Sequence, residues 1–322
     1  MEKKESLPFS LDPLDPKFVP AKPRQEIDEE EVLKLEKEGK VIYTRKRDGN
    51  RLFAATTNRI RLYTSGINDV TDNYPHIIAE IKKMKLPKDT LLDGEVFVQV
   101  DGKDNLPLIG SIMKNKPEKS KEIQKSNPAH YMIFDVPVLE GKELFKETNL
   151  ERIQTVHRFF SRAKFSPKFI FPVEILTCPL KEAQEIVRAN NWEGLVIYVK
   201  DGVSDFRVDG RPNPRPKTCW KWKPLKEDDF IVREKIWVPE GDNQRLKEVV
   251  LTQIDFETGK EFYCAKLGGF EKEIKKYLAD AELPLVMQVE FMSRHESGKL
   301  REPRFMRLRD DKKPDECIYK PE

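Results

Sequence analysis

The segment with the clearest chemical potential is a cluster of cations around a tight turn, Thr44 to Arg51 (TRKRDGNR). Lys46 ends a run with strand character, and Asp48 and Gly49 form a dipeptide typical of turns. This pattern predicts an ε-amino group at the rim of a sheet, with Thr44 on the same strand face. Because arginines occupy positions 45, 47 and 51, we expect like-charge repulsion to depress the pKa of Lys46 and make it a better nucleophile.

Three further motifs each combine an apolar strand with a polar or aromatic residue. Asp93 and Glu95 lie within TLLDGEVFV, so both carboxylates should share one strand face, where burial requires a partner. Phe134 lies within the strand-like IFDV, and Glu193 directly precedes the apolar run GLVIYV. Taken singly, each motif has a common structural interpretation: a basic hairpin for residues 44–51, a polar strand end for Asp93 and Glu95, a core ring for Phe134, and a solvated strand end for Glu193.

The run from Cys219 to Lys223 (CWKWK) alternates strictly between two kinds of residue. Alternation directs Lys221 and Lys223 to one strand face and both tryptophans to the other. Aromatic packing would anchor the strand and fix two ammonium groups, an arrangement suited to neutralising phosphate. A strand with a solvated lysine face is the alternative interpretation.

These motifs must be positioned by a mixed α+β region that we expect to extend to about residue 224. Hydrophobic periodicity and turn residues predict helices within residues 27–39 and at 74–84, 150–163 and 179–191. They predict strands at 41–46, 51–57, 59–64, 90–98, 130–138 and 194–199.

A second region, mostly β, is predicted after the polar hinge candidate at residues 224–229 (PLKEDD). Strands are expected at 229–238, 248–256, 261–268 and 285–292, with one helix at 270–281, a pattern typical of a small barrel such as an OB-fold. Residues 1–25 are rich in proline and charge and lack periodicity. We therefore expect an extended arm at 1–25, a first domain at 26–225 and a second at 226–322.

Length and composition limit the class of protein. The chain has 322 residues, enough for two domains, and is 38% hydrophobic and 36% charged, which gives a sizeable core under a charge-dense surface. The net charge of +3 neither requires nor excludes a polyanionic partner.

Sorting signals and metal motifs are not apparent in the sequence. Apolar runs are too short to cross a bilayer, and the N-terminus does not look like a secretory signal. The four cysteines form no CxxC pair, and the four histidines show no metal-binding spacing. We expect reduced thiols and a cytoplasmic or nucleoid-associated protein, which a phage or virus could also encode.

In their order along the chain, KxDGxR, LDGE, FDV, EGLVI and KWK resemble the motifs of the covalent nucleotidyltransferases, and among these the ATP-dependent DNA ligases. Residues 298–312 (GKLREPRFMRLRDDK) add a sixth motif, similar to the RxDK ending of ligase OB domains. The resemblance covers residues from about 41 to 312. It implies an α+β nucleotidyltransferase (ATP-grasp-like) domain followed by a small β-barrel OB-fold domain, in a minimal two-domain enzyme.

The resemblance also implies a role for each matching residue. Lys46 would attack the α-phosphorus of ATP and form lysyl-AMP, with Asp48, Gly49 and Asp93 as supporting motif residues. The position of Thr44 reads the adenine. Further nucleotide contacts are implied for the ribose (Arg51, Glu95), the base (Phe134), the α-phosphate (Lys221, Lys223) and the leaving pyrophosphate (Arg309, Asp311, Lys312). Glu193 matches a metal-binding carboxylate, with Glu95 as a second candidate.

The implied activity is the sealing of 3′-OH/5′-phosphate nicks in duplex DNA, through lysyl-AMP and an adenylylated 5′ end. ATP would be the nucleotide substrate and Mg²⁺ or Mn²⁺ the metal. The implied partner is a nicked nucleic-acid duplex, DNA in preference to RNA. We expect a monomer that does not bind membranes.

One position departs from the family pattern. After the third strand, ligases usually carry Ser-Arg, whose arginine grips the 5′-phosphate, whereas this chain has Ser65-Gly66. Either Arg59 or Arg61 takes over this contact, or the grip on the nick phosphate is weaker.

Three other functions compete with DNA ligation. The KWKP string also resembles mRNA capping guanylyltransferases, although Glu193 in place of aspartate and the C-terminal motif favour a ligase. An RNA ligase acting on nicked RNA or hybrid duplexes is a second alternative, and KxDGxR disfavours the groups that lack the arginine. A non-catalytic nucleic-acid-binding protein is the third. NAD-dependent ligases are disfavoured because the sequence lacks their zinc-finger spacing.

Overall fold

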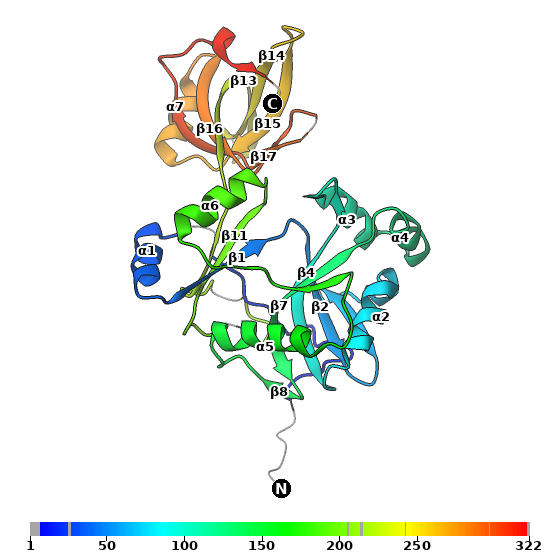
Figure 1. Cartoon of the computed structure of the whole chain (residues 1–322). Helices are drawn as coiled ribbons and strands as arrows, with labels where there is room; N and C mark the ends of the chain where they lie inside the picture. The colour runs from blue at the N-terminus through cyan, green and yellow to red at the C-terminus, as the bar shows by residue number, and fades with distance from the viewer. Residues whose placement is uncertain are drawn as a thin grey trace. The chain divides into compact units, whose positions relative to one another are not determined.

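The computed structural model describes residues 7–24, 27–204, 206–212, 215–241, 243–295 and 297–320. These residues belong to two compact units, Met1–Lys223 and Pro224–Glu322 (Figure 1).

The first sheet of unit 1 carries the basic turn. Its strand order is β10 (Ile175–Leu176), β1 (Val41–Lys46), β11 (Gly194–Val199) and β12 (Cys219–Trp222), and all neighbours are antiparallel. One face packs against α1 (Glu29–Lys37) and α6 (Leu180–Ala189) (Figure 1). Trp220 is almost fully buried there. Asp28 caps the N-terminus of α1, where its side chain accepts a hydrogen bond from the Glu31 amide, and three glutamates in the first turn suit the helix dipole.

The second sheet of unit 1 is larger. Its order is β3 (Ile60–Thr64), β2 (Asn50–Thr56), β4 (Thr90–Phe97), β7 (His130–Leu139) and β8 (Lys142–Glu143), and β9 (Ile170–Pro172) pairs in parallel with β7. One face packs against η1 (Thr71–Asn73), α2 (Pro75–Met84), α3 (Leu106–Lys114), α4 (Pro117–Ile123) and α5 (Asn149–Arg162). A short hairpin, β5 (Gln99–Val100) and β6 (Lys103–Asp104), follows β4.

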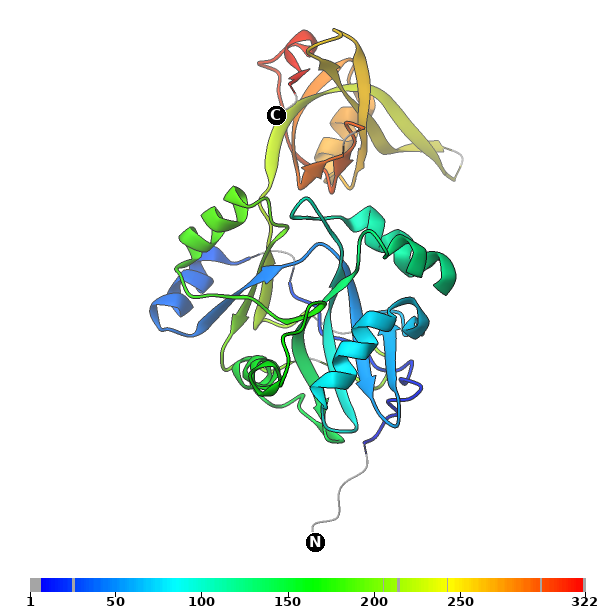
Figure 2. The ribbon, with the colours of Figure 1, turned by 45° about the vertical axis from the view of Figure 1, so that its right-hand side comes forward.

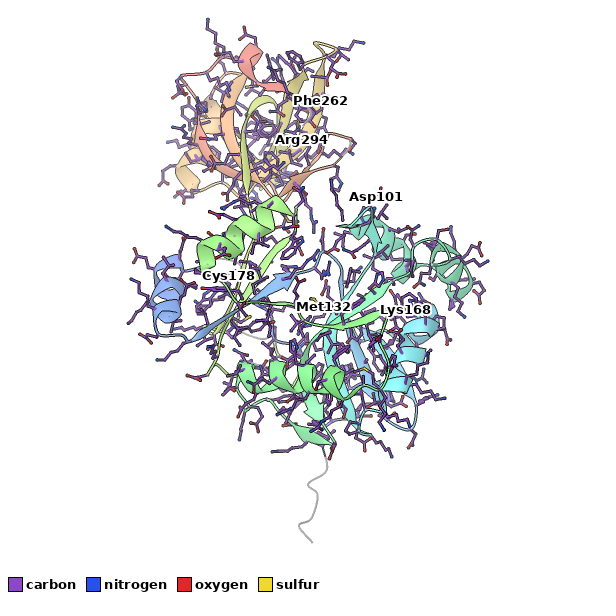
Figure 3. The ribbon with its side chains drawn as sticks, in the orientation of Figure 1. Asp101, Met132, Lys168, Cys178, Phe262 and Arg294 are labelled. Atoms are coloured by element: carbon purple, nitrogen blue, oxygen red, sulfur yellow. The ribbon has the colours of Figure 1, made fainter. Side chains whose placement is uncertain are left out.

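The two sheets of unit 1 face each other across a small apolar layer. Ile42 and Tyr198 from the first sheet meet Phe97 and Met132 from the second, with Ile153 of α5 beside them. Met132 is labelled in Figure 3. Polar motif residues on the same faces are thereby brought toward one another.

The residues just before α1 contribute to the core of unit 1, although the sequence suggests an extended arm there. Residues 7–24 form no helix or strand longer than an isolated bridge, yet four of their apolar side chains are buried: Phe9, Leu11, Leu14 and Phe18. They pack on Phe53 and Tyr63 of the larger sheet. The segment then reaches β12, where the Arg24 amide donates to the carbonyl of Cys219.

Unit 2 is mostly β. Its sheet order is β15 (Glu261–Gly268), β14 (Asn243–Asp255), β13 (Lys226–Glu240), β16 (Leu285–Phe291) and β19 (Arg304–Leu308) (Figure 2). Strand β20 (Ile318–Tyr319) pairs in parallel with β14, and β17 (Ser293–Arg294) pairs with β18 (Leu300–Arg301).

The concave side of this strongly bent sheet encloses an apolar core together with α7 (Lys272–Asp280), and η2 (Pro314–Glu316) precedes β20. Among the described residues, no hydrogen-bonded pairing joins β15 to β19, so the sheet is not a closed barrel. The longest helix in the described parts of the chain, α5, has 14 residues, and none there is long and apolar enough to span a membrane.

Candidate active site

A cavity lies between the two sheets of unit 1. Its volume of about 140 Å³ is roughly ten times what a single water molecule requires, so it is a ligand-sized space rather than a packing defect. Residues from both sheets and from the segment before α1 line it, among them Ala21, Thr44, Lys46, Arg51, Glu95, Phe134 and Val196. Five residues expected at a nucleotide site therefore share one cavity: Thr44, Lys46, Arg51, Glu95 and Phe134.

The register of the first sheet explains the position of the other motifs. Thr44, Val196 and Lys221 lie directly opposite one another on β1, β11 and β12, and Lys46 lies opposite Gly194. Directly opposite residues of antiparallel strands point to the same face. Both tryptophans of CWKWK pack on the helix-covered face, as the alternation predicts.

Lys46 is held by a carboxylate that it shares with a second lysine. Its Nζ contacts Oε2 of Glu193, and Nζ of Lys223 lies 3.1 Å from Oε1 of the same residue. The Glu193 side chain is only 4% exposed. Burial by itself lowers the pKa of Lys46, but the carboxylates of Glu193 and Glu95 outweigh it and raise the pKa above its ordinary value.

The sequence-based prediction of a depressed Lys46 pKa is therefore wrong. The guanidinium of Arg45 lies 4.0 Å from the Trp192 ring and 3.6 Å from Glu174, and that of Arg47 lies 3.1 Å from Asp104. Arg51 is paired with Asp93. Because each arginine has its own acidic partner, the carboxylates that face the lysine decide the direction of its shift.

Arg51 and Asp93 form a buried ion pair on neighbouring strands. Arg51 Nε donates to Asp93 Oδ1 over 2.9 Å, Nη2 contacts Oδ2, and Nη1 donates to the carbonyl of Ala21. This pairing confirms that a buried acid at position 93 needs a partner. Burial raises the pKa of Asp93 to about 6, against the opposing effect of Arg51.

Glu95 lies directly opposite Arg51 in the sheet and lines the cavity. Burial raises the pKa of Glu95 to about 8, and the neighbouring Glu193 adds to the rise, while Lys46 and Arg51 oppose it. This carboxyl group can therefore hold a proton near neutral pH and donate a hydrogen bond.

Phe134 forms an aromatic wall of the cavity. Its ring centroid lies 5.5 Å from the Arg51 guanidinium, and its side chain packs against the apolar layer between the sheets. Thr44 is buried, and its hydroxyl donates to the carbonyl of Val196. The site thus combines one flat apolar surface with several cations.

Two glycines of the motifs allow close backbone contacts. A Cβ atom at Gly49 would lie 2.2 Å from the carbonyl oxygen of Val96, and one at Gly194 would lie 2.0 Å from that of Trp222. Any larger residue at either place would push strands apart. Asp48 lies in the turn, where its amide donates to Asp104.

The three C-terminal motif residues lie in unit 2 around a buried acid. Arg309 Nη1 donates to Oδ1 and Oδ2 of Asp229 over 3.0 and 2.8 Å. Lys312 Nζ donates to Oδ2 of the same carboxylate over 2.8 Å. Arg309 also forms two 2.8 Å bonds with Asp311, which hold the pKa of Asp311 down to about 2.

Both arginines considered as replacements at Gly66 have acidic partners. Arg59 and Arg61 both lie within 3.5 Å of Asp12, and Arg61 also pairs with Asp69. Arg59 lies in the β2–β3 turn, whereas Arg61 lies in β3 and its partner Asp69 belongs to the loop that contains Gly66. Whether one of these arginines takes over the contact with the 5′-phosphate stays a prediction.

Several site residues were not anticipated from the sequence. Asp135 on β7 lines the cavity and binds the buried Arg152, Ala21 accepts from Arg51, and Asp104 contacts the basic turn. Of these residues, only Asp135 could have been identified from the sequence, because it follows Phe134 in the FDV motif.

Comparison with known proteins places this site in a family. The family model described as "ATP dependent DNA ligase domain" matches residues 21–214. A DNA ligase of Thermococcus fumicolans is 25% identical over 88% of this chain and 54% of its own length, and one of Archaeoglobus fulgidus is 28% identical over 81% and 50%. The chain thus spans about half the length of these curated relatives.

Solved structures share the fold. A structure from a study of Lig E DNA ligases as a minimal DNA-binding scaffold covers 90% of this chain and 99% of its own, with a TM-score of 0.65 and 18% identity. The ligase domain of LigD from M. tuberculosis covers 97% and 100%, with a TM-score of 0.52 and 20% identity. With a cavity built from the KxDGxR, LDGE and FDV motifs and a family model that matches more than half of its residues, the chain belongs to the ATP-dependent DNA ligase domain family.

Proposed function

We propose that this protein is an ATP-dependent DNA ligase that works through adenylylation of Lys46. The amine attacks the α-phosphorus of ATP, an N–P bond forms, the bond to the bridging oxygen breaks, and pyrophosphate leaves. The adenylate then passes to the 5′-phosphate of a nick. Attack by the adjacent 3′-OH closes the strand and releases AMP.

The observation that carries this proposal is the arrangement of Lys46, Glu193 and Lys223 beside a cavity with an aromatic wall. Lys46 lines the cavity, while Lys223 shares its carboxylate partner. A triphosphate would offer oxygens to the lysines in place of Glu193. Before attack, the Lys46 ammonium must lose a proton to solvent, and a divalent cation held by Glu193 would make that loss easier because it would neutralise the carboxylate that stabilises the ammonium.

The remaining cavity residues fit an adenosine. The Phe134 ring offers a stacking surface for the base, next to the buried Thr44. Arg51 and a protonated Glu95 can donate hydrogen bonds to ribose hydroxyls. Lys221 lies in the same cross-strand row as Thr44, which supports a role at the α-phosphate.

Mg²⁺ fits this site as an ion shared between the protein and the phosphates. Among the described residues, no group of three or more histidine, cysteine or acidic side chains could hold a metal ion. Glu193 can supply one hard oxygen ligand, and Glu95 a second in its ionised form, which is the usual protein share for Mg²⁺. The ion would neutralise charge on the phosphates.

We further propose that unit 2 is an OB-fold, that residues 26–225 and 226–322 are the two functional domains, and that the enzyme is monomeric. In the described residues of unit 2, a strongly β composition, the single α-helix α7 and an incompletely closed sheet support the OB-fold. Arg309, Asp311 and Lys312 would act on the leaving pyrophosphate, once the cations exchange Asp229 for phosphate.

A strand-sealing assay tests the proposal and separates its alternatives. The protein is incubated with ATP, Mg²⁺ and a nicked duplex made of DNA, RNA or a hybrid of the two. We expect sealing of the DNA nick, and none by Lys46→Ala. Preferential sealing of RNA would favour an RNA ligase, and binding without sealing would favour a non-catalytic protein. In a parallel incubation with labelled nucleotides, labelling of the protein by GTP in place of ATP would favour a capping enzyme.

A further inference from the structure

We propose that Asp104 is a positioning residue that holds the basic turn, and with it Lys46, in the geometry needed for adenylylation. This inference rests on the proposed function of Lys46. Asp104 ends the β5–β6 hairpin, about 60 residues after the turn in sequence, and belongs to none of the ligase-like motifs.

Asp104 uses each carboxylate oxygen on the turn. Oδ1 lies 3.1 Å from Nη1 of Arg47, and Oδ2 accepts the backbone N–H of Asp48 over 3.1 Å. These are the first and second residues after Lys46. The Asp104 side chain is only 8% exposed, so both contacts are largely screened from water.

Other contacts complete the grip on the turn. The Arg47 guanidinium lies 4.3 Å from the centroid of the buried Phe97 ring, and its Nε has no hydrogen-bond partner among the described residues. Asp104 and Phe97 therefore fix the guanidinium between them. Gly49 lies against the Val96 carbonyl, so the turn is held at three consecutive residues.

Asp104 acts through the turn and not on the nucleotide. It does not line the cavity, whereas Arg47 and Lys46 do. Loss of its contacts would free the backbone that follows Lys46 and leave Arg47 without its acidic partner. Because an error of about 1 Å in the position of a reacting group can cost about 100-fold in rate, we expect the rate of adenylylation to fall while ATP still binds.

Asp101 provides a matched control on the same hairpin. It lies at the exposed tip and is labelled in Figure 3. Its backbone has a φ of 51°, a conformation that asparagine tolerates well, so Asp101→Asn removes one carboxylate without disturbing the turn of the hairpin.

The experiment compares the full-length wild type with Asp104→Asn, Asp104→Ala and Asp101→Asn. Single-turnover formation of the adenylylated protein is measured over a range of ATP concentrations. We expect the Asp104 variants to be slower by about 10- to 100-fold at saturating ATP, with half-saturation changed less than threefold. Asparagine, which keeps one acceptor oxygen, should retain more activity than alanine, and Asp101→Asn should match the wild type.

Hydrogen exchange at the Asp48 amide provides a readout that does not depend on ATP chemistry. Exchange should accelerate at least tenfold in both Asp104 variants and not in Asp101→Asn. If rate and exchange in the Asp104 variants equal those of the control, the inference is overturned. If the wild type forms no adduct, the proposed function fails, and the exchange data still decide whether Asp104 holds the turn.

Discussion

Replacing Glu193 by glutamine should have opposite effects on two properties of Lys46. The substitution keeps the shape of the side chain but removes the charge that the ammonium groups of Lys46 and Lys223 share. The chemical reactivity of the Lys46 amine should rise because its neutral form becomes more populated. Adenylylation should fall, since the proposed site loses a carboxylate for the metal.

The magnitude follows from Coulomb's law. Two unit charges about 4 Å apart interact by about 4 kcal/mol at an effective dielectric constant of about 20. The Lys46 side chain is 22% exposed, and Lys223 shares the carboxylate, so we expect roughly 1–2 kcal/mol of this energy to act on Lys46. That energy corresponds to an increase of about 5- to 30-fold in the neutral fraction of the amine.

The assay is acetylation of Lys46 by a small amine-reactive reagent at pH 7.5, followed by peptide mass spectrometry. Glu174→Gln is the matched control, because Glu174 is 45% exposed and lies 3.6 Å from Arg45, not from the lysine. Equal or slower acetylation of Lys46 in Glu193→Gln than in the control would refute the reasoning that this carboxylate holds the amine protonated.

Three further predictions concern the cavity and unit 2. Since burial raises the pKa of Glu95 to about 8, the folded protein binds a proton there more tightly than the unfolded chain, and the stability that this proton contributes is lost as pH rises toward 8. In urea unfolding, the free energy of unfolding of Glu95→Gln should therefore rise relative to that of the wild type between pH 5 and pH 8. A difference between the two proteins that does not change with pH would contradict this prediction. Phe134→Ala should weaken ATP binding about 5- to 150-fold by equilibrium titration, from loss of about 1–3 kcal/mol of stacking, and unaltered affinity would rule out stacking on this ring. Arg309→Ala should slow formation of lysyl-AMP but still seal a nick whose 5′ end is already adenylylated, and equal loss in both assays would exclude a role specific to the first step.

The strand positions of the motifs could be predicted from the sequence because they depend on local pattern. Alternation in CWKWK placed Trp220 and Trp222 on the covered face, and the apolar run TLLDGEVFV placed Asp93 in a buried strand. The meeting of Thr44, Lys46, Arg51, Glu95 and Phe134 in one cavity followed from the family resemblance, since no local pattern brings β1, β4 and β7 together.

Partners distant in sequence could not be predicted. Arg45 and Arg47 flank Lys46 in the chain, but their charges are balanced by Glu174 and Asp104, which only the fold brings near. The β5–β6 hairpin has strands of two residues, too short to show periodicity. Helix α3 did carry a signal, Asn105 as an N-cap followed by Pro107, but its apolar residues were not recognised as a helix.

Buried residues before α1 were missed for a similar reason. Phe9, Leu11, Leu14 and Phe18 are spaced irregularly between prolines, so they match neither the helix nor the strand period. They are buried because the larger sheet leaves an apolar face around Phe53 open on that side.

The most direct test of the account is the mass of the intact protein after incubation with ATP and Mg²⁺, before any nucleic acid is added. The account predicts a gain of one adenylate, located on Lys46 by peptide mapping and absent from Lys46→Ala. An unchanged mass, or an adenylate attached to a different side chain, would contradict it.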